Sequence, residues 1–468
     1  MPFYRFGLVL RSFVQHRGLP FAEALSEATI QQAFDDEGVA FGQGEGDVYT
    51  PALTLWAFLS QVLFKGEQRS CLAAVARVIV LLVTLGQRPC ADDSGAYCRA
   101  RAKLPVVIIR RLTVQVADGC EQQVPDDWLW KGRHHVYLAD GSTVSMPDTA
   151  ANQADYPQPT TQEPGLGFPI ARIVVLISLA TAMIKDMAIG PYAGKETGET
   201  ALLRQLLDRF QSGDILLADR LYCSYFMIAL LMERGIDFVV RLHQARTADF
   251  RRGRRLGPGD HLVDWQRPAK PEWMAQETYE RMPASIRVRE VQVQVDQPGF
   301  RVDSLVVVTT LTDAEQYSRA DLAELYHQRW LAELDLRSIK ITLDLEVLRC
   351  KSPEMVRCEL WTGLLAYNLI RQTMLQAAVQ AGCSPRHLSF AAALQKIAAS
   401  WNTILVCQDA TVLLLIEVHL GDMATHRVGD RPDRVEPRAV KRRPKPQRLL
   451  MEPRAQARAA LLAGAAEE

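Results

Sequence analysis

Residues 134–243 constrain the fold most, because short apolar runs of strand character alternate there with helical segments. The second of these runs is nearly all apolar, which indicates a central strand of a sheet. Helical spacing of apolar residues predicts two helices in GETALLRQLLDRF and YFMIALLMERG. The predicted strands are HHVYLAD, IARIVVLISLAT, AMIKDMAIGPY, GDILLAD and IDFVVRLH. Their order, β-β-β-α-β-α-β, predicts the α/β fold class.

Two of the predicted strands end in an aspartate. Asp140 ends the first strand and is followed by the turn-forming residue Gly141, and Asp219 ends the fourth. Reactive groups in open α/β sheets gather at the carboxyl ends of strands. A single aspartate there is usually a turn or helix-cap residue. Two such ends, together with an acidic helix further along the chain, indicate a site.

That acidic helix is predicted for Tyr326 to Lys340, which reads YHQRWLAELDLRSIK. At about 100° per residue, Tyr326, Arg329, Glu333 and Lys340 fall within a sector roughly 60° wide on a stretch about 21 Å long. A carboxylate can hold a divalent metal, and the three surrounding donors can bind phosphate. The alternative is a solvated helix face carrying charge pairs four residues apart.

Asp140, Asp219 and Glu333 together form a set of three carboxylates from two strand ends and a helix. Such a set suits two Mg²⁺ ions, because hard cations prefer oxygen ligands. Two ions can activate an attacking oxygen and stabilise a leaving one in phosphodiester chemistry without a nucleophilic side chain. The nine cysteines form no C-x2-C pair and no Cys/His spacing suited to zinc.

At these residues the chain resembles the DDE transposases of bacterial insertion sequences, and more specifically their insertion-sequence-4-type branch. The signature of that branch, Y-x2-R-x3-E-x6-K, matches Tyr326, Arg329, Glu333 and Lys340 without a gap. LADGSTVSMPDT and GDILLADRLYCS resemble the two aspartate regions of the family. AYCRARAKLP and VEPRAVKRRPKPQRLL resemble recurring segments near its two ends, so the likeness spans nearly the whole chain.

The resemblance implies a ribonuclease-H-like catalytic core with a β-rich insertion, and Asp140, Asp219 and Glu333 as catalytic metal ligands. It implies two Mg²⁺ ions, with Mn²⁺ as a substitute. It also implies a homo-dimer on double-stranded DNA that cuts the terminal inverted repeats and joins the 3′-hydroxyls to target DNA.

In the same branch the signature Tyr, Arg and Lys contact phosphates, which makes Tyr326, Arg329 and Lys340 expected DNA-binding residues. Trp330 stands where some relatives carry a tryptophan that receives a flipped base during hairpin excision. Packing of Trp330 in the core is the alternative, and the excision route stays open.

The domain boundaries follow from changes in composition and periodicity. The insertion alternates apolar and polar residues around the turn QPG, which predicts an antiparallel hairpin. Its arginine-rich loop FRRGRRLGPGD either lies along DNA or is solvated, and the same two readings hold for the basic residues of AYCRARAKLP. We expect a helical N-terminal DNA-binding domain (1–128), the first part of the core (129–244), the insertion (245–315), the last part of the core with the signature helix (316–375), C-terminal helices (376–424) and an extended basic Pro/Arg-rich tail (425–468).

The formal net charge of zero makes no global prediction of nucleic-acid binding, so local charge matters more. The odd number of cysteines and the absence of an apolar leader in the first residues predict a cytoplasmic protein that acts on chromosomal or plasmid DNA. The most apolar windows are too short to span a bilayer, so we expect no membrane partner, and no small-molecule substrate.

Two other functions fit parts of the sequence. A DNA-binding protein derived from a transposase would have lost catalysis, but all four signature residues and both aspartates are present. An aspartate phosphotransferase would use Asp140 as its nucleophile. Enzymes of that kind have a second acid two residues further on, and Ser142 stands there instead.

Overall fold

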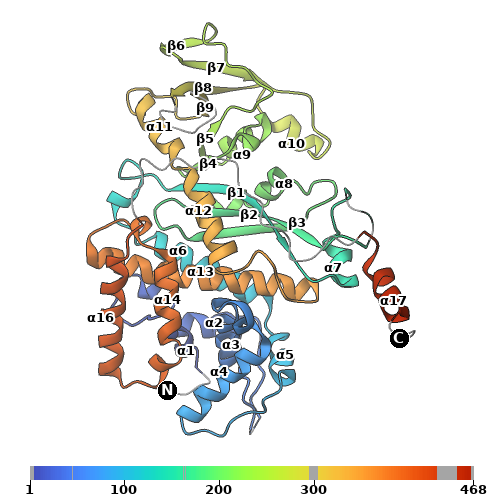
Figure 1. The fold of residues 1–468 in the computed structure, drawn as a ribbon. Helices are drawn as coiled ribbons and strands as arrows, with labels where there is room; N and C mark the ends of the chain where they lie inside the picture. The colour runs from blue at the N-terminus through green and yellow to red at the C-terminus, as the bar shows by residue number, and fades with distance from the viewer. Residues whose placement is uncertain are drawn as a thin grey trace.

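The computed structural model describes residues 5–44, 46–161, 163, 165–294, 304–428 and 451–464. Figure 1 shows one large sheet through the middle and upper part of the molecule, with helices packed beneath it. The turn QPG of the predicted hairpin and most of the predicted basic tail lie outside the described residues.

Nine strands form this sheet in the order β3-β2-β1-β4-β5-β9-β8-β7-β6. β1 runs antiparallel to β2 and parallel to β4, and β4 runs parallel to β5. All five strands predicted between residues 134 and 243 are therefore present, in one sheet. The strands are β1 (Val136–Ser145), β2 (Ile170–Ser178), β3 (Ile184–Pro191), β4 (Ile215–Ala218), β5 (Asp237–Arg241), β6 (Arg254–Gly257), β7 (Asp260–Gln266), β8 (Ser285–Gln294) and β9 (Ser304–Thr309).

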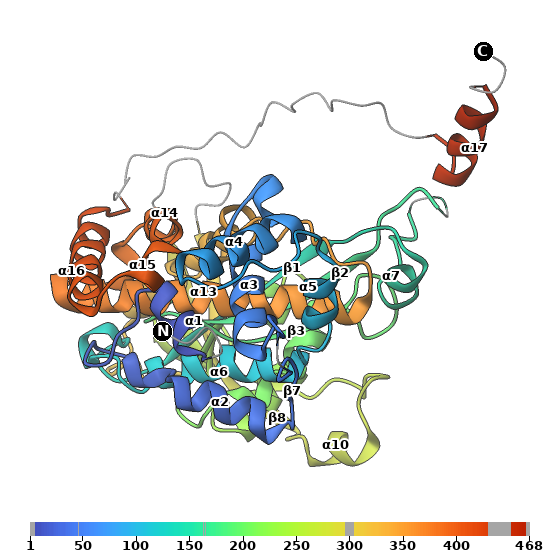
Figure 2. The same ribbon diagram turned by 90° about the horizontal axis from the view of Figure 1, so that it is seen from below.

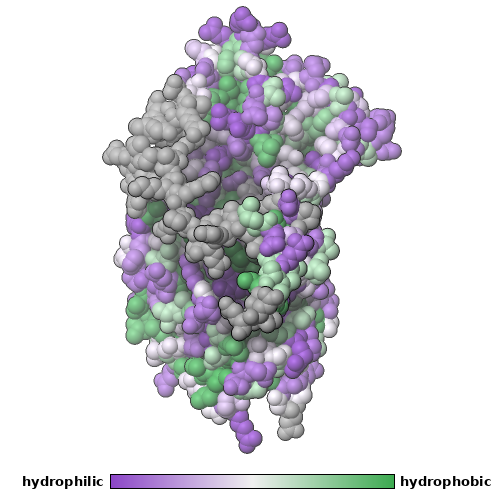
Figure 3. Space-filling model, turned by 45° about the vertical axis from the view of Figure 1, so that its right-hand side comes forward, coloured by the Kyte–Doolittle hydropathy of each residue, from purple (hydrophilic) through white to green (hydrophobic). Residues whose placement is uncertain are grey.

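The strands between residues 254 and 309 extend the same sheet. β8 and β9 pair antiparallel, as the alternating sequence predicts, and β9 also pairs antiparallel with β5. The predicted insertion is thus continuous with the rest of the sheet through the β5–β9 pair. In Figure 3 hydrophilic residues crowd the upper end of the molecule, where β6 and β7 lie in Figure 1. Arg254 and Arg255 of β6 are exposed there.

Helices from both ends of the chain cover one side of the sheet. Figures 1 and 2 show α13 running between the sheet and the helices α1 to α5, with α14 and α16 beside them. The α-helices are α1 (Gly7–Ser12), α2 (Glu27–Asp36), α3 (Pro51–Leu63), α4 (Cys71–Thr84), α5 (Gly95–Arg101), α6 (Val106–Glu121), α7 (Ala150–Asp155), α8 (Glu199–Arg204), α9 (Tyr225–Glu233), α10 (Gln276–Arg281), α11 (Arg319–His327), α12 (Trp330–Arg337), α13 (Pro353–Ala381), α14 (Phe390–Ser400), α15 (Thr403–Val406), α16 (Asp409–Thr425) and α17 (Arg454–Gly464). Short 3-10 turns are η1 (Ala22–Ala24), η2 (Gly66–Arg69), η3 (Asp126–Trp128), η4 (Leu207–Arg209), η5 (Arg220–Tyr222) and η7 (Pro385–His387).

One apolar cluster joins these helices to the sheet. It contains Phe13 of the N-terminal helical region, Leu138 of β1, Leu364 of α13 and Ile397 of α14, all buried. A second cluster lies on the other face of the sheet, where α8 and α9 pack. Residues of the segment 1–128 share this single apolar cluster with β1 and α13. Their separation from the core as a domain of their own stays a prediction.

The structure corrects three local predictions. β1 continues past Asp140 to Ser145, because β2 pairs with it along that whole length, up to Ser145 opposite Ile170. The prediction that Gly141 begins a turn is therefore wrong. The stretch from Tyr326 to Lys340 is not one regular helix: α11 ends before a turn at residues 328–329, α12 follows, and Ser338–Thr342 forms a π-helical turn (η6). The tail is not extended at residues 454–464, where an alanine-rich sequence of high helix propensity forms α17.

Candidate active site

Strand register places Asp140 and Asp219 side by side. The last pair between the parallel strands β1 and β4 is Ala139 opposite Ala218, so the next residue on each chain is an aspartate. β4 ends there, and the backbone of Asp219 remains extended, at φ −79° and ψ 169°. Asp140 thus lies at the carboxyl end of its neighbour β4 although its own strand continues.

Both aspartates point to the same face of the sheet. Along a strand successive side chains alternate between the two faces. Leu138 and Leu217 belong to the apolar cluster that includes α12, whereas Ala139 and Ala218 belong to the cluster on the opposite face. The alternation therefore directs the next residues, Asp140 and Asp219, toward the side where α12 packs against β1.

Glu333 reaches this place from α12. A surface hollow of about 300 Å³ is lined by Asp140 and Glu333 together with Gly141, Leu336, Arg337, Lys340, Ile341 and Glu346. Two of the three predicted metal ligands and one predicted phosphate ligand thus share one hollow, and Asp219 adjoins it through the β1–β4 register.

Each of the three carboxylates already accepts a hydrogen bond. Asp140 Oδ1 accepts from the N–H of Gly141 at 2.9 Å, and Asp219 Oδ1 accepts from the N–H of Arg220 at 2.6 Å. Glu333 Oε1 accepts from the guanidinium of Arg329 at 3.0 Å. The pair between Arg329 and Glu333 is partly exposed, with side-chain exposures of 21% and 39%. Arg329 therefore holds Glu333 instead of standing free for phosphate.

Burial and neighbouring charges shift the pKa of Asp140. Burial raises it to about 6, against the lowering effects of the Gly141 N–H and of Arg329, and the negative charges of Glu333 and Glu199 raise it as well. A carboxyl group in this setting is difficult to ionise, and a cation bound beside it would favour the ionised form.

The remaining signature residues differ in their exposure. Tyr326 is only 8% exposed, and burial raises the pKa of its phenol to about 12. Lys340 pairs with Glu346 at 3.2 Å. Trp330 is 52% exposed and so does not pack in the core, which removes one of its two predicted roles. Its role toward DNA stays a prediction.

Three residues near the hollow were missed by the sequence analysis. Arg337 follows Glu333 by four residues and lines the same hollow, so helical spacing could have found it. Glu346 gave no local signal in the sequence. An isolated β-bridge between Ser145 of β1 and Val347 brings it to the hollow, and that contact joins distant parts of the chain. Glu199 of α8 lies against Gly141, where an added Cβ would come within 2.2 Å of its Cδ. A glycine inside a strand is the signal of such a close approach.

The basic residues of AYCRARAKLP are not all free for DNA. Arg101 donates to Gln61 Oε1 at 2.8 Å and lies over the ring of Phe58 at 5.0 Å. Lys103 lies over the ring of Phe41 at 5.5 Å. For Arg101 the structure therefore favours a packing role within the helical region.

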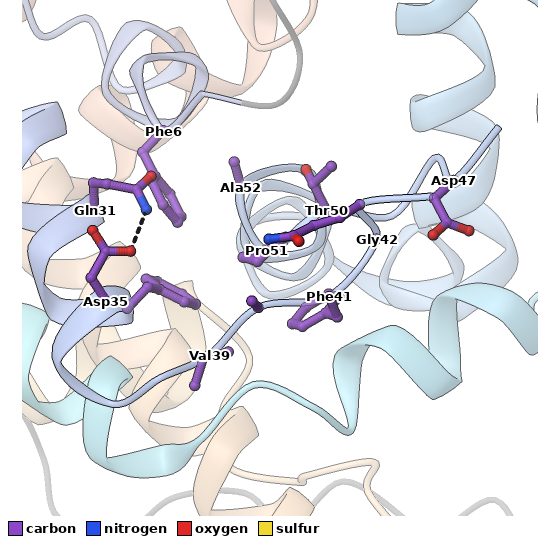
Figure 4. A pocket seen from close by; sticks show the side chains of 13 residues that line it. Phe6, Gln31, Asp35, Val39, Phe41, Gly42, Asp47, Thr50, Pro51 and Ala52 are labelled. Atoms are coloured by element: carbon purple, nitrogen blue, oxygen red, sulfur yellow. Dashed lines mark hydrogen bonds between the residues drawn. The ribbon is translucent and has the colours of Figure 1, made fainter. Parts of the chain in front are cut away.

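A larger cavity lies far from this chemistry. Helix α2, the loop before α3 and the start of α3 enclose about 400 Å³ between them. Figure 4 shows Gln31 and Asp35 hydrogen-bonded on one side, at 2.8 Å, with Phe6 and Phe41 among the other side chains that line it. Its carboxylates, Asp35 and Asp47, disfavour phosphate, and no acidic signature residue lies there.

A comparison with known proteins decides the family. The family model described as "Transposase DDE domain" matches residues 131–369, a span that contains both aspartates and the whole signature. The chain belongs to the DDE transposase family. This match confirms the resemblance noted in the sequence, and it makes transposition the supported class of function.

Individual relatives agree with the family. The chain is 26% identical over 401 residues to the transposase InsG for insertion sequence element IS4 of Escherichia coli K12, covering 84% of this chain and 85% of the relative. It is 35% identical over 65 residues to the transposase for insertion sequence element IS421 of Escherichia coli, covering 14% of this chain and 18% of the relative. A cryo-EM structure of a piggyBac transposase synaptic complex with hairpin DNA is 10% identical, covers 89% of this chain and 86% of that chain, and has a TM-score of 0.42, too low to establish a common fold.

DDE transposases generally use divalent metal ions, and the donor set here is suited to them. Carboxylate oxygens are the ligands that Mg²⁺ and Mn²⁺ prefer, and a nearby cation would favour the ionised form of Asp140, whose pKa is raised by burial. In the described part of the chain no three His, Cys, Asp or Glu side chains converge closely enough to hold an ion. In this structure Glu333 is instead bonded to Arg329, and each aspartate accepts a hydrogen bond from a backbone N–H.

None of the described helices is long and apolar enough to cross a membrane.

Proposed function

We propose that this protein is a transposase that binds the terminal inverted repeats of an insertion sequence. It cleaves the DNA ends by metal-dependent phosphodiester hydrolysis and joins the freed 3′-hydroxyls to target DNA by transesterification. The observation that carries the proposal is the convergence of Asp140, Glu333 and Lys340 on one hollow, with Asp219 beside Asp140 in register.

The topology of the first five strands supports a ribonuclease-H-like core. Three antiparallel strands, β3, β2 and β1, continue into the parallel strands β4 and β5. We propose residues 129–244 and 316–375 as the two parts of this core, with 245–315 as its insertion. The proposed assembly is a homo-dimer on paired ends, acting on bacterial DNA in the cytoplasm.

We propose Asp140, Asp219 and Glu333 as the ligands of the divalent ions, Mg²⁺ or Mn²⁺. When bound there, such ions supply Lewis acidity at the scissile phosphate and activate the attacking oxygen. The chain itself supplies the geometry: β1 and β4 fix the two aspartates, and α12 brings the glutamate across the same face of the sheet.

Binding of the DNA strand falls to the cations along α12 and η6. Arg329 and Lys340 each pair with a carboxylate in the free protein, at 3.0 and 3.2 Å. A phosphate would take over one or both of these pairs, because charge-assisted bonds to phosphate are strong and can be bidentate for arginine. Arg329 transferred to phosphate would release Glu333 for metal. Tyr326 is largely buried beside Arg329 and would act mainly through that residue. Trp330 offers an exposed ring for an unstacked base.

A nicking assay beside a gel shift, on one labelled end-containing duplex, tests the proposal. We expect the wild type to bind the duplex and to nick it only with Mg²⁺ or Mn²⁺. Asp140→Asn should bind equally well and nick at no measurable rate. Asp155→Asn, which removes an exposed carboxylate on α7 paired with Arg357, is the matched control and should nick like the wild type. Nicking by Asp140→Asn at the wild-type rate would overturn the assignment.

A further inference from the structure

A second carboxylate on α12, Asp335, points away from the hollow into the protein. It lies two residues after Glu333, which is about 200° around the helix. Asp335 is only 2% exposed, whereas the Glu333 side chain is 39% exposed. The signature Y-x2-R-x3-E-x6-K does not include Asp335, and the proposed reaction does not use it.

Both oxygens of Asp335 are engaged by buried arginines. Oδ1 accepts from Arg371 of α13 at 2.8 Å, and Oδ2 accepts from Arg386 of η7 at 2.9 Å. The side chains of the two arginines are 6% and 11% exposed. One buried carboxylate thus balances part of the charge of two buried guanidinium groups.

The two arginines are fixed to other parts of the protein. Arg386 also donates to the carbonyl of Leu179 at 2.6 Å and to that of Ser178 at 2.7 Å, at the end of β2. Arg371 donates to the hydroxyl of Tyr367 at 2.9 Å. That hydroxyl has a single proton and lies 3.0 Å from the carbonyl of Ala182 and 3.3 Å from Asp335, so its better donation is to Ala182. Asp335 therefore links α12 to α13, to η7 and to the turn between β2 and β3.

Helix α12 needs such a link more than a long helix would. It has only eight residues, no side chain caps its N-terminus, and the π-helical turn η6 follows it directly. Short helices gain their stability mainly from tertiary packing. The rotation of α12 about its axis decides whether Glu333 faces Asp140, and Asp335 is its only deeply buried charged group.

We propose that Asp335 is a positioning residue for the active site. Through its ion pairs with Arg371 and Arg386, it fixes α12 on the sheet so that the Glu333 carboxylate lies where it can share a divalent ion with Asp140 and Asp219. This inference rests on the proposed metal role of Glu333.

The test measures Mn²⁺ binding directly, by the electron paramagnetic resonance signal of free Mn²⁺, in the protein bound to an end-containing duplex. Asp335→Asn keeps the shape of the side chain but turns one acceptor into a donor that faces an arginine. The matched control is Asp186→Asn on β3, which also removes a buried carboxylate that is ion-paired with two arginines, Arg110 and Arg209. Thermal unfolding and the gel shift are recorded for each variant.

We expect both variants to unfold at a lower temperature and to bind the duplex within twofold of the wild type. Asp335→Asn should raise the Mn²⁺ concentration for half-saturation at least tenfold, with nicking partly restored at high Mn²⁺, whereas Asp186→Asn should leave that concentration within twofold. Arg386→Lys keeps the charge but loses the bonds to Ser178 and Leu179, and should give an intermediate shift. If Asp335→Asn does not fold, the Mn²⁺ half-saturation of Arg386→Lys is compared with that of the wild type instead.

Equal Mn²⁺ half-saturation in Asp335→Asn and Asp186→Asn, or in Arg386→Lys and the wild type, would overturn the positioning role. Failure of the proposed function looks different. In that case Glu333→Gln would bind Mn²⁺ and nick the duplex like the wild type.

Discussion

The two faces of α12 carry carboxylates two residues apart in opposite environments. Glu333 is partly exposed, has one ion-pair partner, and lines a hollow open to solvent. Asp335 is buried and has both oxygens bound by arginines from distant parts of the chain. A carboxylate with a replaceable partner can exchange it for a metal or a substrate, whereas one with a closed set of partners can only hold structure in place. The difference in partners therefore assigns different tasks to two residues of similar chemistry.

The largest expected effect is on the exposed face. Glu333→Gln should reduce the rate of Mg²⁺-dependent nicking by about 10³-fold or more, because metal ions stabilise transition-state charge by several kcal/mol and each 1.36 kcal/mol is a factor of ten. Gel shifts should show unchanged binding of the duplex. A nicking rate within tenfold of the wild type would contradict the role of Glu333 as a metal ligand, and with it the functional contrast to Asp335.

The buried face should dominate stability. Asp335→Ala leaves two guanidinium groups uncompensated and should lower the free energy of unfolding by about 3–5 kcal/mol. Glu333→Ala removes a partly exposed pair and should change it by about 1 kcal/mol or less. Urea unfolding monitored by circular dichroism compares the two variants. Similar losses in both would mean that burial does not separate their roles.

Asp140, across the hollow from Glu333, should show its raised pKa in the pH dependence of stability. The folded protein holds a proton on Asp140 up to a pH of about 6, above the ordinary value of 3.8, so ionisation opposes folding as the pH rises through that window. Asp140→Asn should therefore gain stability relative to the wild type between about pH 4 and pH 6, by at most about 3 kcal/mol, with no further gain above. Thermal unfolding in metal-free buffers from pH 4 to pH 8 measures this gain. A gain that is the same at pH 4 and pH 8 would contradict the pKa shift.

The smallest effect concerns Arg337, which lines the hollow and has no ion-pair partner in the described ranges. If it binds one phosphate, Arg337→Ala should weaken binding of the duplex and lower the slope of log K against log salt by about 0.9. Arg357→Ala, which removes an ion-paired arginine of α13, is the control. Equal slopes for both variants and the wild type would show that Arg337 binds no phosphate.

Much of this arrangement could be predicted from the sequence. Apolar runs of strand length gave all five core strands, and their last residues included the two aspartates that register brings together. Helical spacing placed Glu333 on one face with three phosphate-binding donors, and the resemblance to the family signature then selected it as the partner of the aspartates. These features are local or periodic, so a single sequence contains them.

What escaped prediction depends on residues far apart in the chain. Gly141 and Ser142 look like a turn by composition, yet pairing with β2 keeps them in β1. The π-helical turn at Ser338–Thr342 has no marker in its own residues. Asp335 resembles any acid on a helix, because the arginines that define its role lie 36 and 51 residues away.

The central claim, that Asp140, Asp219 and Glu333 share a divalent ion, has a direct test in the protein–duplex complex. Fe²⁺ with ascorbate and peroxide, in place of Mg²⁺, generates hydroxyl radicals that cut the peptide backbone next to the bound ion. Mass spectrometry should find cuts grouped next to residues 140, 219 and 333, and added Mg²⁺ should suppress all three groups together. Cuts that fall elsewhere, or that persist at saturating Mg²⁺, would contradict the account.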